Sequence, residues 1–194
     1  ADNLHMDIWL DGCNLLIDAG SYKYNAAKAD LDYFLGTESH NTVKLDHHDQ
    51  MLKGGRFIWY YWSQSLYTKV SETDDAFVFE GGIKAFTYLN KNLIHHRKLI
   101  KYKNNAKWEV IDSIDGKGEG QVMRQLWHPK CSQKYELSIT NKDPGAEVFS
   151  KNGFVSRFYG TKEETTYTSI ETKKSQLKTI LIIHEDTFAA PILS

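Results

Sequence analysis

Short segments in which apolar and polar residues alternate, separated by turn residues, recur along the chain and restrict it to β structure. The first segment places Leu4, Met6, Ile8 and Leu10 on one face. Asp11-Gly12 then marks a hairpin turn before a returning apolar strand. Similar turn signals return roughly every 8–12 residues, the spacing of sandwiches and barrels. The pattern predicts an all-β fold, a two-layer antiparallel β-sandwich of many short strands.

Helical periodicity is confined to one place, residues 26–34, so we expect few short helices, one of them near Ala26–Phe34. The chain shows no linker, internal repeat or low-complexity tract, which predicts a single domain over residues 1–194. It opens on "ADNLHMDIWL" without an initiator Met and already in strand-like alternation. We therefore expect it to be a piece of a longer protein.

Composition excludes several classes of function. The formal net charge of −1 and a pI near 6.8 give no general attraction to nucleic acid or to an anionic membrane. No apolar run reaches transmembrane length. A glycine-rich phosphate loop, a nucleophile elbow and an HExxH motif are also missing from the sequence. Cys13 and Cys131 match no zinc or redox motif, and two thiols or one disulfide are both open.

An aromatic segment, "RFIWYYWSQSLYTK" over residues 56–69, allows two interpretations. Exposed aromatic faces stack on sugar rings, which would suit a carbohydrate-binding surface. Aromatic strands are more often buried, because each ring removes a large apolar area from water. We therefore predict that this segment contributes mainly to the core.

Histidine and aspartate residues gather towards the N-terminus, where they are candidate metal ligands. A metal site needs several nitrogen or oxygen donors converging from different elements. Asp18 ends an apolar strand, where it either binds a metal or caps the turn at Gly20. His40 begins a strand and is either a ligand or a hydrogen-bonded structural residue. The full candidate set is Asp2, His5, Asp7, Asp18, His40, His47, His48 and Asp49.

The other histidines give weaker signals. His47 and His48 are adjacent, and neighbouring strand residues point to opposite faces, so a solvated turn is the favoured interpretation of "DHHD". The pair at 95–96 lies in a basic strand, where a structural or solvated role is favoured. His128 ends a strand and could face a substrate groove.

The order of motifs resembles that of the heparinase II/III-like family of polysaccharide lyases. That family shows His-Ala-Asp, an alternating strand, a Gly turn, an apolar strand ending in Asp-x-Gly, a nearby Tyr, and Ser/Ala-His-Asn-Thr-Val. This chain has "ADNLHMDIWLDGCNLLIDAGSYKYN" followed by "YFLGTESHNTVKLD". Downstream, "HHRKLIKYKNNAKWEVIDSIDG", "RQLWHP" and "SRFYG" are similar to later motifs of the family. The resemblance covers nearly the whole chain, in order.

The resemblance implies the C-terminal β-sandwich domain of a two-domain protein, without its N-terminal α/α-toroid domain. The family cleaves acidic, uronate-containing polysaccharides by β-elimination, in a groove between the two domains. Membership would imply a bacterial protein that is periplasmic or secreted. The alternative is a non-catalytic sandwich that binds carbohydrate or braces a partner domain.

The resemblance also assigns residues. By position, a structural zinc or other divalent metal would be held by Asp2, Asp18 and His40, with His5 as an alternate ligand. Tyr22, Tyr24 and Asn41 would line the groove. A catalytic-type His would stand immediately before Ala1, so we expect this chain to be inactive alone.

Overall fold

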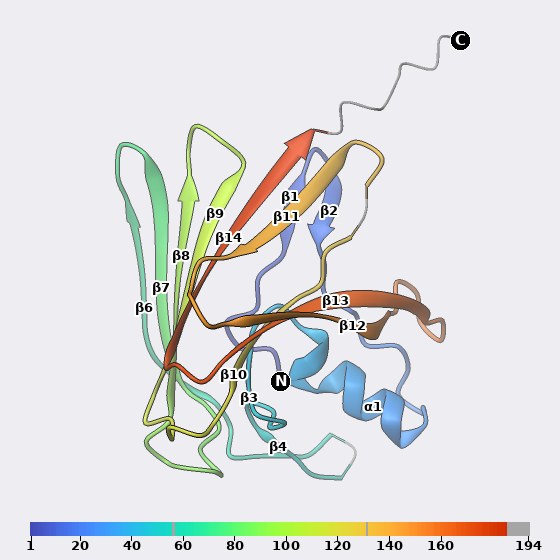
Figure 1. The fold of residues 1–194 in the computed structure, drawn as a ribbon. Helices are drawn as coiled ribbons and strands as arrows, with labels where there is room; N and C mark the ends of the chain where they lie inside the picture. The colour runs from blue at the N-terminus through green and yellow to red at the C-terminus, as the bar shows by residue number, and fades with distance from the viewer. Residues whose placement is uncertain (56, 131, 186–194) are drawn as a thin grey trace, which may run out of the picture.

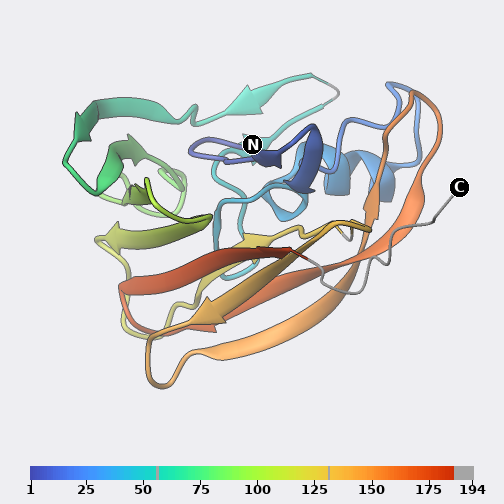
Figure 2. The same ribbon diagram turned by 90° about the horizontal axis from the view of Figure 1, so that it is seen from above.

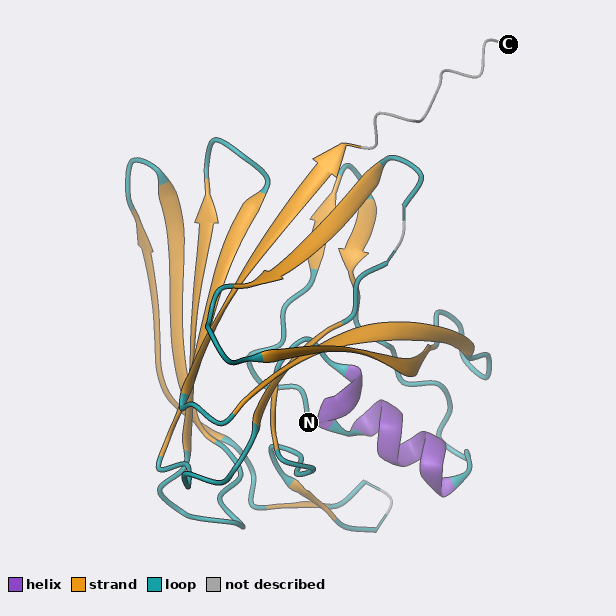
Figure 3. Cartoon of the chain, viewed as in Figure 1, coloured by secondary structure: helices purple, strands orange, loops and turns teal. Residues whose placement is uncertain are grey.

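The computed structural model describes residues 1–55, 57–130 and 132–185 and confirms the predicted fold class. Strands make up 51% of the described residues and helix only 6%, far below the third or so that is helical in an ordinary globular domain. Two large antiparallel sheets dominate, and two small two-stranded sheets flank them (Figure 3).

The larger sheet has six strands in the order β11-β14-β9-β8-β7-β6, every neighbouring pair antiparallel. Consecutive strands from β6 to β9 are neighbours, so this half is a simple meander (Figure 1). Its strands are β6 (Gln64–Glu72), β7 (Ala76–Lys84), β8 (Ile94–Tyr102), β9 (Lys107–Asp115), β11 (Tyr135–Asn141) and β14 (Gln176–Glu185).

The smaller sheet has four strands in the order β12-β13-β10-β3, and it covers one face of the larger sheet (Figure 2). Its strands are β3 (Val43–Leu45), β10 (Met123–Trp127), β12 (Glu147–Val155) and β13 (Glu163–Thr172). Val110 and Leu181 from the larger sheet and Met123 and Ile170 from the smaller one belong to a single buried apolar cluster. This cluster is the core of the sandwich.

The predicted N-terminal hairpin is present, formed by β1 (Ile8–Leu10) and β2 (Cys13–Leu16). Asp11 and Gly12 both have positive φ, as a tight hairpin turn requires. The amide of Ile17 donates to the carbonyl of His128, just after β10. The end of the hairpin is thereby tied to the end of a strand in the smaller sheet.

Helix α1 (Lys28–Leu35) forms close to the predicted residues 26–34, and a short 3-10 helix, η1 (Thr37–Ser39), follows it. The Tyr33 hydroxyl accepts from the Phe154 amide at 3.0 Å and donates to the Phe154 carbonyl at 3.2 Å. This contact fastens α1 to β12 and fixes where the chain re-enters the sandwich.

The prediction that the aromatic segment contributes to the core is wrong for most of its described residues. Phe57 is 67% exposed and Trp62 is 65% exposed. The segment includes only β5 (Trp59–Tyr60), which pairs with β4 (Leu52–Lys53), and most of the edge strand β6. No residue of β5 or β6 is buried, so the rings on these strands stay partly or largely exposed. Arg56 lies outside the described residues.

Two further expectations concern the chain as a whole. Cys13 is half-buried in β2, whereas Cys131, and with it the question of a bridge between the two, lies outside the described residues. In the part of the chain that the structure describes, no helix has the length and apolar character needed to cross a bilayer.

Candidate functional site

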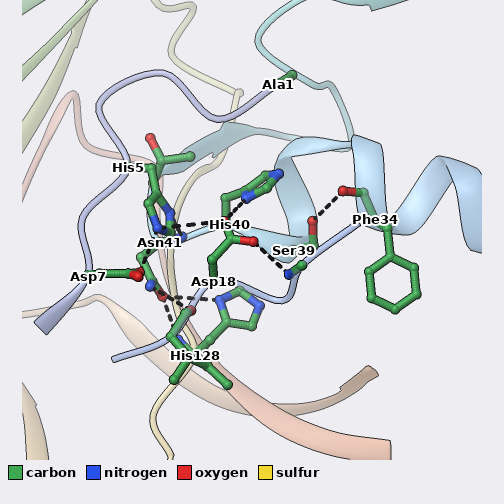
Figure 4. A network of polar contacts seen from close by, with 12 residues as sticks. Ala1, His5, Asp7, Asp18, Phe34, Ser39, His40, Asn41 and His128 are labelled. Atoms are coloured by element: carbon green, nitrogen blue, oxygen red, sulfur yellow. Dashed lines mark hydrogen bonds and ion pairs between the residues drawn. The ribbon is translucent and has the colours of Figure 1, made fainter. Parts of the chain in front are cut away.

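Asp18 and His40 meet between the loop after β2 and the loop after η1 (Figure 4). His40 Nδ1 lies 2.6 Å from Asp18 Oδ2. The amide of Ala19 donates to the Ser39 carbonyl at 3.3 Å, so the two backbones already run close together here. Residues 22 positions apart in sequence therefore form one polar pair.

The two carboxylate oxygens of Asp18 have separate partners. Oδ1 accepts from the Gly20 amide at 2.6 Å, which is the turn cap that the sequence allowed. Oδ2 remains available to His40. Burial alone would raise the pKa of Asp18, but the hydrogen bond and charge of His40, with the Gly20 amide, lower it to about 2. Asp18 is therefore an anion at neutral pH.

His5 completes a cluster in which single donor atoms of His5, Asp18 and His40 all lie within 4.8 Å of one another. His5 Nε2 is 3.7 Å from Asp18 Oδ2 and 2.8 Å from Asp7 Oδ1. The backbone amide of Asn41 donates to His5 Nδ1 at 2.8 Å. Because Nδ1 is an acceptor, a neutral His5 carries its proton on Nε2 and donates it to Asp7.

A cavity of about 320 Å³ opens beside the pair and is lined by Asp2, Asp18, His40, Trp59 and several backbone segments. Asp2 is exposed at this cavity and is not a member of the 4.8 Å cluster. His5 belongs to the cluster and not to the cavity lining. The structure thus places Asp2, Asp18 and His40 around one space, with His5 behind it.

The donor set suits a divalent metal, since imidazole and carboxylate groups are ordinary ligands of zinc. His5 is close enough to Asp18 and His40 to be the third ligand. Both of its ring nitrogens, however, are already hydrogen-bonded, to Asp7 and to the Asn41 amide. A ligating nitrogen needs a free lone pair, whereas His5 Nε2 carries a proton as long as the Asn41 amide occupies Nδ1. Asp2 has no such restriction, because an ionised carboxylate only accepts. The hydrogen bonds of His5 therefore favour Asp2 over His5 as the third ligand.

The three residues expected to line a groove lie in different environments. Tyr24 is 70% exposed and contacts the rings of Phe57 and Tyr159. Tyr22 is half-buried with its ring 5.5 Å from that of Phe34. Asn41 differs from the expectation: it is fully buried, and its side chain bonds only to groups within the domain. Its position supports a structural role.

His128 is also buried and does not face a groove. Its amide donates to Asn41 Oδ1 at 2.7 Å, and its ring stacks on Tyr167 with centroids 4.9 Å apart. Burial, with a further contribution from His40, lowers the pKa of His128 to about 4. His128 is therefore neutral at pH 7.

The remaining histidines follow the favoured interpretations. His47 and His48 are exposed at a turn, as expected for "DHHD". On the outer side of the larger sheet, His96 Nε2 donates to Asp115 Oδ2 at 3.1 Å, and its Nδ1 hydrogen-bonds to the Tyr67 hydroxyl at 2.9 Å. His95 is fully buried, with Nε2 2.8 Å from Asp112 Oδ1. The pair at 95–96 is thus structural.

Sequence reasoning missed a residue that links the larger sheet to this site. Arg97 is buried in β8 and pairs with Asp112 in β9, directly opposite it. Its Nη1 donates to the carbonyls of Leu4 and Asn41 at 2.6 and 2.7 Å. The only available signal was the basic strand beginning at His95, which could not reveal contacts so distant in sequence.

An all-β sandwich in which Asp18 and His40 form a polar pair beside a cavity does not by itself define a class of protein, and comparison with known proteins does. The model of the family described as "Heparinase II/III-like, C-terminal" matches residues 1–187, so the chain belongs to this family.

Solved structures agree in fold. The heparan sulfate lyase HepC of Pedobacter heparinus superposes with a TM-score of 0.75 at 19% identity, over 97% of this chain and 31% of that one. A heparinase III gene product gives a TM-score of 0.72 at 17% identity, over 95% of this chain and 30% of that one. The chain thus spans less than a third of the length of these structures. Comparison with proteins of curated function gives no match.

Proposed function

We propose that this chain is the C-terminal domain of a polysaccharide lyase that cleaves a uronate-containing polysaccharide by β-elimination. The observation that carries the proposal is the family match over residues 1–187, together with the Asp18–His40 pair beside a cavity. The solved relatives are heparan sulfate lyases and heparinases, which act on acidic polysaccharide. An acidic polysaccharide is therefore the proposed substrate class.

The division of labour follows from the chemistry of elimination. A base must remove the proton on C5 of the uronate, an acid must protonate the leaving oxygen, and a positive group must offset charge on the carboxylate. We propose that this domain supplies one wall of the groove, with Trp59 and the cavity beside it. The rest of a longer chain, as an N-terminal α/α-toroid domain, would supply the other wall and part of the proton-transfer groups. Secretion or a periplasmic location would give access to the polymer.

A divalent metal, such as zinc, is proposed to bind Asp2, Asp18 and His40. Two carboxylates facing one cavity repel each other and would repel a uronate, and a bound cation neutralises both. When bound, the metal would brace the hairpin against the loop that carries His40. The side chains themselves orient the site, because Asp18 also fixes the turn at Gly20.

The lyase proposal is tested by assaying this chain and the longer protein against heparan sulfate, hyaluronan, chondroitin and alginate. Formation of the unsaturated uronate is followed by its ultraviolet absorbance. We expect turnover by the longer protein and a rate lower by about 10²–10⁴ or more for this chain alone, since positioned proton-transfer groups are missing. Equal rates would contradict the division of labour.

A second candidate, a carbohydrate-binding module without catalysis, is favoured by the exposed contacts of Tyr24 with Phe57 and Tyr159. The same assay separates the two functions. Retention of the polymer by the longer protein without any unsaturated product would support the binding module and reject the lyase.

The metal proposal predicts that Asp18→Asn lowers bound zinc from about one ion per chain to a small fraction of one, because an amide is a far weaker ligand than a carboxylate. Elemental analysis of protein dialysed against zinc measures this stoichiometry. His47→Asn is the matched control, since His47 is exposed at a turn outside the cluster and should leave zinc unchanged. Full zinc occupancy in Asp18→Asn would reject the assignment.

A further inference from the structure

We propose that Asn41 and Arg97 are positioning residues that together hold the candidate metal ligands in place. Neither side chain reaches the cavity beside Asp18 and His40. Both act on the backbone next to the ligands. The inference rests on the proposed metal site and identifies the residues that fix the positions of its ligands.

Asn41 binds both legs of the N-terminal hairpin. Its Nδ2 donates to the carbonyls of Met6 at 3.0 Å and Ile17 at 2.9 Å. Ile17 immediately precedes Asp18, and Asn41 itself immediately follows His40. One buried amide group therefore sets the spacing between the two central ligands.

The backbone and the carbonyl oxygen of Asn41 extend this control. Its amide fixes the tautomer of His5 by donating to Nδ1 at 2.8 Å. Its Oδ1 accepts from the amide of His128 at 2.7 Å, which ties the group to the end of β10. With Nδ2 and Oδ1 both bonded inside the protein, the Asn41 side chain has a single orientation.

Arg97 supports Asn41 from the larger sheet. Its Nη1 donates to the carbonyl of Asn41, next to His40, and to that of Leu4, next to His5 and near Asp2. One guanidinium nitrogen thus bridges the N-terminal segment and the His40 loop, which are 37 residues apart. A lysine could not reproduce this arrangement, because an ammonium lacks the planar fork of donors.

Arg97 is itself held rigidly. Its Nε and Nη2 each lie 2.8 Å from an oxygen of Asp112, a bidentate pair. Asp112 is fully buried, and its oxygens are also bonded by His95 at 2.8 Å and by Gln125 Nε2 at 2.7 Å. Four nitrogen atoms thus hold the Asp112 carboxylate in place. The carboxylate in turn fixes the Arg97 guanidinium against the carbonyls of Leu4 and Asn41.

The experiment compares Asn41→Asp and Arg97→Lys with Val110→Ala in this chain. Val110 is a fully buried core residue of β9 and makes no polar side-chain contact, so its variant controls for lost stability alone. Zinc affinity is measured by competition with a chromophoric chelator, and the thermal midpoint is measured in excess EDTA. We expect a 10- to 100-fold loss of zinc affinity in Asn41→Asp and Arg97→Lys, the usual effect of removing groups that orient ligands. Val110→Ala should keep the wild-type affinity.

A metal-free measurement separates this inference from the metal proposal. Long-range ¹H–¹⁵N spectra of the imidazoles at pH 8 in EDTA should show His5 protonated on Nε2 and His40 on Nδ1 in the wild type and in Val110→Ala. Averaged tautomers in both site variants support positioning, even if the wild type binds no zinc, a result that would reject the metal alone. Unchanged tautomers, or wild-type zinc affinity in variants destabilised as much as Val110→Ala, would overturn the positioning role.

Discussion

At the scale of single residues, His128 shows how burial makes stability depend on pH. Its pKa is lowered from 6.5 to about 4 in the folded chain, first of all by burial. The unfolded chain binds a proton as the pH falls below 6.5, and the folded chain does not until about pH 4. The free energy of unfolding therefore decreases as the pH falls from 6.5 to about 4, and it increases again as the pH rises. This one residue contributes about 3 kcal/mol to the total change.

We predict that His128→Phe flattens this part of the pH profile while keeping the ring stack on Tyr167. Urea unfolding in EDTA at pH 4.5, 5.5 and 7 measures it, with His47→Asn as a control at an exposed turn. If the free energy of unfolding of His128→Phe still depends on pH as in the wild type, another residue causes the effect. The buried His95 is one such residue, because burial also lowers its pKa.

The residues of the site were predictable to different degrees. The resemblance to the family's motifs placed Asp18 and His40 in one site, and the structure brings them together, whereas the residue types alone favoured a turn cap for Asp18 and a structural role for His40. The role of Asn41 could not be predicted, since its partners at Met6, Ile17 and His128 are set by tertiary packing. Arg97 was out of reach for the same reason, with a partner 93 positions away.

At the scale of elements, the loop between β2 and α1 depends on Gly20. Gly20 has a φ of +81°, and an added Cβ would lie 2.2 Å from the Ser156 carbonyl oxygen. The same loop is tied to the end of β12 by the Ser156 amide, which donates to the Ala19 carbonyl at 2.7 Å. A side chain at position 20 would push the loop, with Asp18, off the smaller sheet.

We predict that Gly20→Ala lowers the free energy of unfolding by at least about 2–3 kcal/mol, through backbone strain and the clash together. Gly12→Ala is a matched control, because Gly12 has a similar φ of +77° with nothing within 4 Å of an added Cβ. It should lose only about 1 kcal/mol, from strain alone. Equal losses in urea titrations would show that the contact with Ser156 is unimportant.

The strands were predictable from alternation, and their exposure was not. Period-2 patterning describes which residues share a face, as in β9, where Val110 and Asp112 both point inward. It does not reveal whether a strand lies at the centre or the edge of a sheet. The aromatic residues around Trp62 were therefore assigned to the core, although the sheet order leaves β6 at the edge.

At the scale of the whole molecule, the larger sheet grades from a buried centre to an exposed edge. Strand β9 lies between β8 and β14 and carries Val110, Asp112 and Ile114 in the interior. No residue of β6 is buried, and only β7 pairs with it. Local opening should therefore cost much less at β6 than at β9.

We predict that amide hydrogen exchange in β6 is faster than in β9 by about two orders of magnitude or more, corresponding to some 3 kcal/mol of opening free energy. Exchange followed by mass spectrometry on peptides covering residues 64–72 and 107–115 measures the ratio. Equal protection of the two peptides would mean that the edge strand opens only with global unfolding.

The separate partners of the two Asp18 oxygens affect how the sequences of related domains should be interpreted. Because Oδ1 shapes the turn at Gly20 while Oδ2 meets His40, natural selection can retain the aspartate for the turn after the chemistry has been lost. Its presence in a diverged sequence is thus a poor marker of a working site. Among the described contacts, His40 has no comparable side-chain bond to the backbone of a turn, so substitution at that position should be an earlier sign that a relative has lost the proposed metal site.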